Sequence, residues 1–449
     1  MPEIIPFIGV RYNQRLCECL NDVLAPPYNA ISPKDQEDLY QRHERNLVRL
    51  IMGKEQLGDD DYSNKYNRAA NFFAKWKTEN VLTEDEKACY YIYEQEFVVP
   101  GEKQRRKRRG FSGLLRLEPL QKGSVLAHEQ TFHAPKLDRL KLIRACQANF
   151  CNTLMIYHDR EKESDQLLAE AAAEQPEVEF TDQSGVVHRL WLMCDAMQIQ
   201  QVRALMKAKK LLIAEGHHRY ECAIQYSVEM QRALPKSRGP HAFNYLLAHH
   251  VNAEDQGVVA LPIHRVLNKD LGLGVGHDEV LEDLGRHYTM KPFSVEMSES
   301  AKAAACIRRQ QHQNAKVTSE MIMLFPDGRA YVLTLKPDAD LDEMIENEQS
   351  HLLKRMPVNL VQQHIIPLVW IGNPEIEIEQ EDVFYPHTIE QVLTLLNSKQ
   401  GCAAFILKPI EIEDIVKVAE QGERMPQNST YFYPPLISGL VMRDMRLRI

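Results

Sequence analysis

The stretch KKLLIAEGHHRYE, residues 209–221, decides how the fold of this chain is interpreted. Leu211–Ala214 is a short apolar run, which predicts a buried strand. Gly216 has no Cβ and therefore permits a tight turn at positive φ. From His218 onward, apolar residues recur every three to four positions, which predicts a helix. The expected local structure is a strand, a glycine turn and a helix.

The start of that helix is a candidate anion site. Backbone N–H groups at a helix N-terminus converge, and the helix dipole favours negative charge there. His217 and His218 bring two imidazoles to the same place, and Arg219 can grip a phosphate through two N–H groups. This pattern predicts a phosphate or nucleotide site. The alternative is a polar helix start whose histidines cap neighbouring groups, because a short motif is weak evidence.

Length and composition indicate a soluble globular protein with a substantial core. The chain has 449 residues, of which 44% are hydrophobic and 26% charged. The formal net charge of −9 argues against a surface that mainly binds nucleic acid. The sequence has no apolar run of about eighteen residues and no signal-peptide pattern at its start, so we expect no membrane partner and a cytoplasmic location.

Nine cysteines occur at irregular spacing, without a Cys-x-x-Cys pair. We therefore expect reduced cysteines that mostly lie in the core. Seventeen histidines raise the alternative of a metal hydrolase. The spacing does not favour it, because adjacent His217 and His218 cannot readily face one ion from a helix.

Two pairs of strands are expected. Ala88–Val99 and Gly110–Leu117 read as partners, with the basic run at 103–109 at the tip between them. Such a run can be a nuclear signal or a nucleic-acid patch. The acidic balance of the chain favours a solvated loop and strand end. Phe243–Val251 and Val258–His264 are expected to form an antiparallel pair.

Residues 127–144 combine a polar loop with a charged helix. Lys136 and Arg139 could cradle a phosphate, and Glu129 or Asp138 could act as a base or hold Mg²⁺. The alternative, which spacing alone favours, is a solvated helix in which Asp138 pairs locally.

The C-terminal stretch at 422–435 is rich in aromatic residues and prolines. Such a tail would not be left loose in water, so we expect it to pack back on the body of the protein.

Several motifs together resemble one family. They are the Pro-Pro-Tyr loop at 26–28, YEQEF at 93–97, the segment from His128 to Arg144, ANF at 148–150, GHHRYE at 216–221, LPIHR at 261–265 and the tail from Arg424 to Pro434. In this order and nearly end to end, they resemble the prokaryotic family of domain of unknown function 1015. The Gly-His-His-Arg turn further resembles the phosphate-binding turn of the ParB/sulfiredoxin-like fold, which includes free-serine kinases.

The resemblance implies a fold and an organisation. The expected class is α/β with mixed α+β character. A ParB/sulfiredoxin-like phosphate-binding core, elaborated with hairpins, would occupy residues 1–240. An α+β region would occupy residues 241–449, with its tail packed on the core.

The resemblance also implies a phosphotransferase that acts on a small hydroxyl compound, with free L-serine as the expected acceptor and phosphoserine as product. The donor would be ATP, ADP or pyrophosphate with Mg²⁺. The partner expected is a small-molecule substrate, and a homodimer is left open. The alternative is a nucleotide-binding regulatory protein without catalysis.

Site residues fall into three groups. The catalytic candidates are Glu129, Glu215 and His218. The candidates for binding phosphate or nucleotide are Gly216, His217, His218, Arg219, Lys136, Arg139, His264 and Arg265. The candidate metal ligands are Glu129 and Asp138.

The sequence departs from the family pattern at a few of these motifs. Asn29 and Glu215 stand where the family usually has Asp, and Asn428 stands where it usually has Lys. An amide at position 29 cannot act as a base. If the family's aspartate has that role, this chain is weakened, altered or dependent on Glu129.

Overall fold

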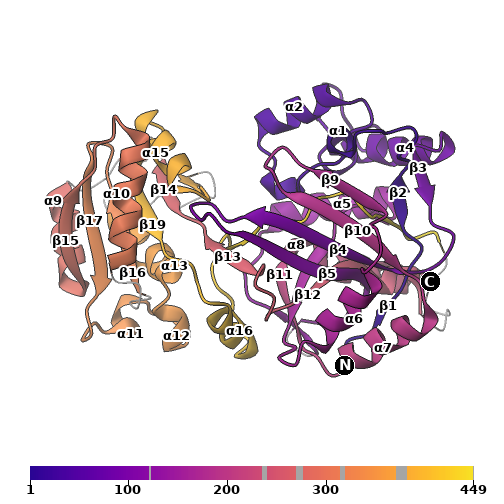
Figure 1. The fold of residues 1–449 in the computed structure, drawn as a ribbon. Helices are drawn as coiled ribbons and strands as arrows, with labels where there is room; N and C mark the ends of the chain where they lie inside the picture. Colours follow the sequence, from indigo (N-terminus) through magenta and orange to yellow (C-terminus); the bar gives the residue numbers. More distant parts are fainter. Residues whose placement is uncertain (121–122, 235–239, 269–276, 314–318, 371–381, 448–449) are drawn as a thin grey trace. The chain divides into compact units, whose positions relative to one another are not determined.

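The computed structural model describes residues 1–120, 123–234, 240–268, 277–313, 319–370 and 382–447. By internal contacts the chain divides into two units. The first unit comprises residues 1–127, 131–259 and 432–449, and the second comprises residues 128–130 and 260–431. Figure 1 shows the helices and strands of both units. The predicted α/β class with mixed character is confirmed, because each unit combines a sheet with helices.

The strands of the first unit are β1 (Ile4–Ile5), β2 (Val10–Tyr12), β3 (Leu82–Glu84), β4 (Tyr90–Val98), β5 (Arg105–Arg116), β6 (Val125–Ala127), β7 (Ala148–Asn149), β8 (Thr153–Tyr157), β9 (Val178–Thr181), β10 (Val187–Met193), β11 (Leu211–Glu215), β12 (Tyr245–Asn252) and β21 (Arg443–Asp444). Its helices are α1 (Leu20–Val23), α2 (Pro33–Arg42), α3 (Val48–Ile51), α4 (Lys65–Thr78), α5 (His133–Cys146), α6 (Glu163–Ala171), α7 (Ala196–Met206) and α8 (His217–Ala233), with the 3-10 turns η1 (Tyr28–Ala30) and η2 (Ala242–Asn244).

The large sheet of the first unit has the order β6-β11-β8-β12-β5-β4-β10-β9, and β1 pairs with β5. It is a mixed sheet, because β6 and β11 are parallel whereas β11 and β8 are antiparallel. The central strands are buried along their whole length: every residue of β8 and β12 is buried. This sheet carries the strand that leads into the Gly216 turn.

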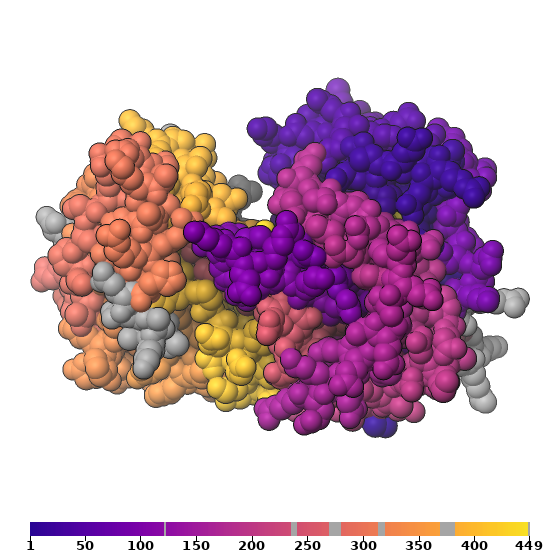
Figure 2. Space-filling model, in the orientation of Figure 1, coloured from indigo at the N-terminus to yellow at the C-terminus, as the bar shows by residue number. Residues whose placement is uncertain are grey.

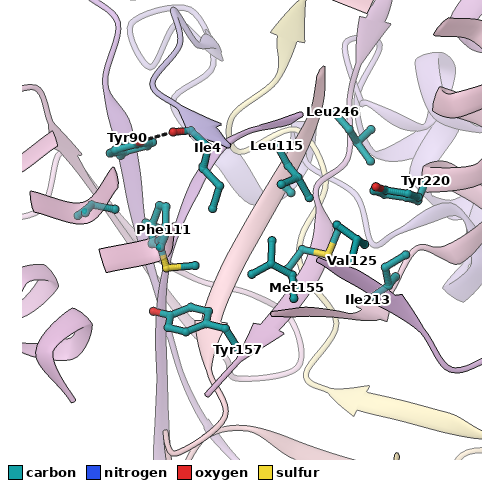
Figure 3. Close-up of a cluster of buried hydrophobic side chains, with 14 of the residues drawn as sticks. Ile4, Tyr90, Phe111, Leu115, Val125, Met155, Tyr157, Ile213, Tyr220 and Leu246 are labelled. Atoms are coloured by element: carbon teal, nitrogen blue, oxygen red, sulfur yellow. Dashed lines mark hydrogen bonds between the residues drawn. The ribbon is translucent and has the colours of Figure 1, made fainter. Parts of the chain in front are cut away.

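One hydrophobic cluster holds the sheet and its helices together. Met155, Ile213 and Phe111 come from the strands, while Tyr220 comes from α8. Figure 3 shows these side chains with the hydroxyl of Tyr90 donating to the backbone oxygen of Ile4 at 2.8 Å. The core of the first unit therefore fixes α8 directly on the sheet.

The second unit contains β13 (Val259–Pro262), β14 (Arg265–Asn268), β15 (Tyr288–Ser294), β16 (Glu320–Leu324), β17 (Arg329–Leu335), β18 (Val383–Phe384), β19 (Gly401–Leu407) and β20 (Thr430–Tyr433), with the unit borders inside β13 and β20. Its helices are α9 (His277–His287), α10 (Ser300–Gln313), α11 (Leu341–Met344), α12 (His351–Lys354), α13 (Pro357–Leu360), the π-helix η4 (Val361–Ile365), α14 (Ile366–Trp370), α15 (Ile389–Asn397) and α16 (Ile412–Glu420).

The sheet of the second unit is antiparallel, in the order β15-β17-β16-β19-β14-β18. Side chains of α10 and α15 pack on one set of its residues in a second hydrophobic cluster, which includes Ile307, Val392, Ile322 and Ile406. Among the described residues, no helix combines the length and the apolarity needed to cross a membrane.

The predicted antiparallel pair of strands after α8 is wrong. Residues 245–252 form β12, but this strand pairs with β5 in an antiparallel ladder and with β8 in a parallel ladder. The reason is burial: all eight residues of β12 are buried, so the strand belongs in the middle of the sheet rather than in a hairpin.

The basic run forms part of a strand. Arg105–Arg109 are the first residues of β5, where they lie opposite the acidic strand β4. Ion pairs join Arg105 to Glu96, Arg106 to Glu102, and Lys107 and Arg109 to Glu94. Figure 2 shows the exposed end of the hairpin of β4 and β5, near residue 100, at the surface. The predicted strand is thus extended by five residues, and carboxylates of β4 pair with Arg105, Lys107 and Arg109.

The expectation that all cysteines are reduced is wrong for one pair. Cys89 and Cys194 form a disulfide, while the other seven cysteines are free. The two cysteines lie just outside β4 and β10, next to the paired residues Tyr90 and Met193. The strand pairing brings them together across a separation of 105 residues, which spacing in the sequence does not reveal.

Replacing the exposed Cys194 by serine removes this cross-link without leaving a cavity. We expect Cys194→Ser to lower the free energy of unfolding by about 4 kcal/mol, because a cross-link that closes a long loop restricts the unfolded chain. Chemical denaturation under non-reducing conditions measures it, and Cys19→Ser, at an exposed free cysteine, is the control. Equal unfolding of Cys194→Ser and wild type would contradict the cross-link.

Candidate functional site

The turn between β11 and α8 has the predicted form. β11 ends at Glu215, Gly216 has a φ of +101°, and α8 begins at His217. A side chain at this φ would be strained, which explains the glycine. Gly216 is the N-cap residue and provides no side-chain cap to the helix. The N-cap side chain therefore does not stabilise the positive end of the dipole of this 17-residue helix, and other groups must do so.

The two histidines of the turn take different positions. His217 is buried, with 5% of its surface exposed. His218 accepts a hydrogen bond at Nε2 from the backbone N–H of Phe132, at 3.1 Å. Nε2 of His218 therefore holds the loop before α5 against the start of α8.

Arg219 folds back over the turn. Its Nη2 lies 3.5 Å from Oε1 of Glu215, and Nη1 donates to the backbone oxygen of Asn152. The side chain is 11% exposed. A Cβ at Gly216 would come within 2.9 Å of Nη2, so the absence of a side chain there makes this position of the guanidinium accessible.

Arg139 approaches the same region from α5. Its guanidinium stacks over the ring of Tyr28 at 4.1 Å and donates to the backbone oxygen of Ile51 at 2.8 Å. It also pairs with the neighbouring Asp138. Burial raises the pKa of Tyr28, although the charges of Arg139 and Arg219 act to lower it. The phenol of Tyr28 therefore lies in the field of both guanidinium groups.

Asp138 is held by three partners. It accepts from the hydroxyl of Tyr66 at 2.8 Å, and Lys65 lies 3.2 Å away in addition to Arg139. Burial alone would raise its pKa, but the charge and hydrogen bonds of Arg139, with Tyr66 and Lys65, hold the pKa below the usual value for Asp. Asp138 pairs locally with Arg139, as the alternative drawn from spacing expected, but Tyr66 and Lys65 of α4 hold it as well, so this part of α5 is packed rather than solvated.

Lys136 also has a carboxylate partner. Its Nζ lies 3.1 Å from Oε2 of Glu221 in α8, and the same oxygen accepts from the hydroxyl of Thr131 at 2.6 Å. Lys136 therefore links α5 to α8 by an ion pair.

A pocket lies where α5, α8 and the segment after β7 meet. Its empty space, including the part open to solvent, is about 490 Å³. Both Arg139 and Arg219 line it, with Tyr28. The remaining lining is mostly apolar and consists of Ile51, Leu142, Ile143, Ala148, Asn149, Phe150, Cys151, Cys222 and Leu246. Two guanidinium groups in an apolar pocket can bind an anionic group of an organic ligand.

Three predicted site residues belong to the second unit. Glu129 accepts hydrogen bonds at Oε1 from the backbone N–H groups of Ser429 and Thr430, at 3.1 and 3.0 Å, and from the hydroxyl of Thr430. This carboxylate therefore fixes the middle of the stretch at 422–435. Spacing could not have suggested this, because the partners are about 300 residues away.

His264 and Arg265 are enclosed within the second unit. His264 accepts at Nδ1 from the backbone N–H of Leu407 at 3.2 Å, and burial lowers its pKa to about 3. Arg265 is fully buried, donates to the backbone oxygens of Ile263 and Gln427, and stacks on Tyr385. Both candidate binding residues are therefore engaged by groups of the second unit itself.

Within the part of the chain that the structure describes, no three or more His, Cys, Asp or Glu side chains are grouped so as to hold a metal ion. The candidate ligand Asp138 is occupied by cations in the first unit, and Glu129 by backbone donors in the second.

Sequence reasoning left out several residues of the site. Tyr28 lies in the Pro-Pro-Tyr loop, which was recognised only as an ordered loop of the family. Glu221 belongs to the GHHRYE motif, yet its pairing with Lys136 depends on the packing of α5 against α8. Asn152, whose backbone oxygen accepts from Arg219, carried no signal in the sequence.

The fold and the pocket define a mixed α/β protein with a pocket that two arginines line. The chain belongs to the family described as protein of unknown function (DUF1015), whose model matches residues 4–359. The predicted family membership is thus confirmed. A search among curated proteins gives no match.

Some solved structures resemble the chain at low similarity. A conserved hypothetical protein from Pyrococcus furiosus is 12% identical, with a TM-score of 0.33, and the match covers 70% of this chain and 91% of that one. A free serine kinase in complex with AMP is 12% identical, with a TM-score of 0.31 and coverage of 70% and 92%. SbnI with a C-terminal truncation, from Staphylococcus aureus, is 11% identical, with a TM-score of 0.31 and coverage of 72% and 84%. At these TM-scores the likeness carries no argument about activity.

The Gly216 turn can be tested by adding one methyl group. We expect Gly216→Ala to lower the free energy of unfolding by about 1–2 kcal/mol, because φ is positive. It should also displace Arg219, which a Cβ would meet at 2.9 Å. Gly185→Ala is the matched control, since Gly185 has a φ of +80° and open space around it. Thermal unfolding measures the first effect, and loss of anion binding in Gly216→Ala alone would report the second.

Asp138 should make stability depend on pH. Because its folded pKa lies below the ordinary value, its contribution is present above about pH 4 and is lost as the pH falls through the folded pKa. We expect Asp138→Asn to cost about 2–3 kcal/mol at pH 7 and much less at pH 2–3. Denaturant titrations at both pH values test it, with Asp283→Asn at an exposed ion pair as control. A cost that does not change with pH would contradict the assignment.

Proposed function

We propose that the first unit binds a phosphorylated ligand in the pocket lined by Arg139 and Arg219. We further propose that the protein is a phosphotransferase acting on a small hydroxyl compound. The observation that carries the proposal is the convergence of two guanidinium groups on one pocket, next to a helix start without a side-chain cap. Phosphoryl transfer depends mostly on positioning and on neutralisation of charge, and these groups supply both.

The two arginines have different parts in this proposal. Arg139 is fixed by Asp138, by Tyr28 and by the carbonyl of Ile51, so it is a rigid part of the wall. Arg219 lies at 3.5 Å from Glu215, a loose ion pair that a phosphate can replace. Arg219 is therefore the group that grips the incoming anion.

Glu215 is the best-placed base among the predicted catalytic residues of the first unit. Nε2 of His218 accepts a backbone hydrogen bond, so its lone pair is occupied. When a phosphate binds Arg219, the ion pair between Arg219 and Glu215 is broken. The carboxylate of Glu215 can then take up the proton of the substrate hydroxyl. We propose that Mg²⁺ enters with the phosphates of the donor, since it is commonly held by substrate phosphates and few carboxylates.

The acceptor proposed is free L-serine and the donor is ATP, ADP or pyrophosphate, as the family resemblance implies. The alternative is a regulatory protein that binds a nucleotide without turnover. Two observations favour the alternative. Asp138 and Glu221 are paired with cations, and position 29 carries an exposed amide instead of a carboxylate.

Binding is tested by calorimetry with ATP, ADP, AMP and pyrophosphate, with and without Mg²⁺. We expect Arg219→Met to weaken the preferred ligand at least tenfold, because a charge-assisted hydrogen bond contributes about 1.5–3 kcal/mol. Arg144→Met is the matched control, since Arg144 lies on α5 but pairs at the surface with Glu229. Failure of all four ligands to bind would refute both functions.

Turnover separates the two functions. The protein is incubated with L-serine, Mg²⁺ and each donor, and phosphoserine is followed by phosphorus NMR. Appearance of phosphoserine supports the kinase. A nucleotide that binds while its concentration stays constant over hours supports the regulator, and it excludes serine as acceptor.

A further inference from the structure

Three buried polar atoms lie close to the Gly216 turn. Among the residues that the structure describes, no hydrogen-bond partner reaches Nε of Arg219, Oδ1 of Asn152 or Oγ1 of Thr153. Asn152 is 8% exposed and Thr153 is fully buried. These are one donor, one acceptor and one hydroxyl that can do either.

The three residues belong to one place in the fold. Nη1 of Arg219 donates to the backbone oxygen of Asn152, which joins the two directly. In the antiparallel ladder Glu215 lies opposite Leu154, so the next residue of one strand, Gly216, lies beside the preceding residue of the other, Thr153. Cys151, the residue before Asn152, lines the pocket.

Energetics make this arrangement unusual. More than about 90% of buried polar groups in proteins have a partner, and each buried group without one costs about 1–3 kcal/mol. The three atoms belong to Asn152 and Thr153, which are consecutive, and to Arg219, which binds the backbone oxygen of Asn152 and lines the pocket. A ligand that enters there could supply the missing partners.

We propose that Asn152, Thr153 and Nε of Arg219 form a subsite for the acceptor substrate, and that Asn152 and Thr153 determine its specificity. This inference rests on the proposed phosphotransferase. The class of ligand is a small molecule that carries a hydrogen-bond donor within a few bonds of an anionic group. The anionic group accepts from Nε of Arg219, and the donor group binds Oδ1 of Asn152.

The chemistry of the subsite explains what it would reject. A site built to hydrogen-bond a ligand discriminates strongly against an analogue without that group, because its own buried atoms are then left unpaired. Thr153 adds a second contact for a hydroxyl or an ammonium. Glu215 lies close enough to Arg219, at 3.5 Å, to balance an added positive charge.

The ligand class is tested with four small molecules. L-serine has a hydroxyl, an ammonium and a carboxylate. L-glycerate, which has the same configuration, carries a hydroxyl in place of the ammonium. L-alanine lacks the hydroxyl and ethanolamine lacks the carboxylate. Calorimetry is run on the whole protein, with and without the nucleotide that binds best. We expect ethanolamine to bind at least tenfold more weakly than L-serine. The affinities of the other two ligands show whether Asn152 binds the hydroxyl or the ammonium.

The variants Thr153→Val and Asn152→Leu each replace a side chain whose polar atom has no partner by an apolar side chain of nearly the same size. We expect each to weaken binding of the preferred ligand at least tenfold and to leave nucleotide affinity within threefold of wild type. Thr153→Val should keep or raise the melting temperature, because it removes a buried hydroxyl without a partner. Thr181→Val, at an exposed threonine of β9, is the matched control.

The outcomes separate this inference from the proposed function. Nucleotide binding without binding of any of the four ligands would overturn the subsite and leave the nucleotide site standing. Unchanged ligand affinity in both variants would also overturn it, and would assign the three atoms to an enclosed water. Ligand binding that the variants abolish, without any nucleotide binding, would retain the subsite and refute the phosphotransferase.

Discussion

Two positive charges that share one mostly apolar pocket must be compensated by the protein around them, and much of the site follows from this constraint. Unpaired charge in a low dielectric is costly, so each guanidinium has a carboxylate beside it. Asp138 serves Arg139 and Glu215 serves Arg219. The packing of α5 against α8, through residues such as Leu140 and Cys222, holds the two pairs at a common pocket. The positions of the charges are therefore set by an apolar contact between helices.

The same compensation sets the resting state of the site. Asp138 has three partners and therefore holds Arg139 rigidly in the wall of the pocket. The ion pair between Glu215 and Arg219 is longer, at 3.5 Å. A ligand can exchange the loose pair for its own contacts at small cost. Arg219 also donates to the backbone oxygen of Asn152 on this loose side. Rigid and adaptable parts of the site thus face the same pocket.

Local elements around the site could be predicted, and their pairing could not. The spacing of the apolar residues and the glycine at position 216 predicted the strand β11, the turn and the helix α8, because each of these depends on neighbouring residues. The partners of β12 depend on which strands share its burial, and the hairpin expected there was wrong. The cross-link between Cys89 and Cys194 follows from the pairing of β4 with β10. Long-range register is a property of the whole sheet, so it left no local signal.

The sequence by itself determined that a glycine turn with a neighbouring arginine starts a helix, because φ at Gly216 and the periodicity of α8 are local properties. It also determined the family, since the motifs recur in order along the chain. Only the tertiary structure decided which charges are engaged: Lys136 by Glu221, Asp138 by Lys65, and Glu129 by backbone groups of the tail. Side chains far apart in the sequence become partners only when the elements that carry them are packed, and this packing brought Tyr28 to the pocket that Arg139 and Arg219 line.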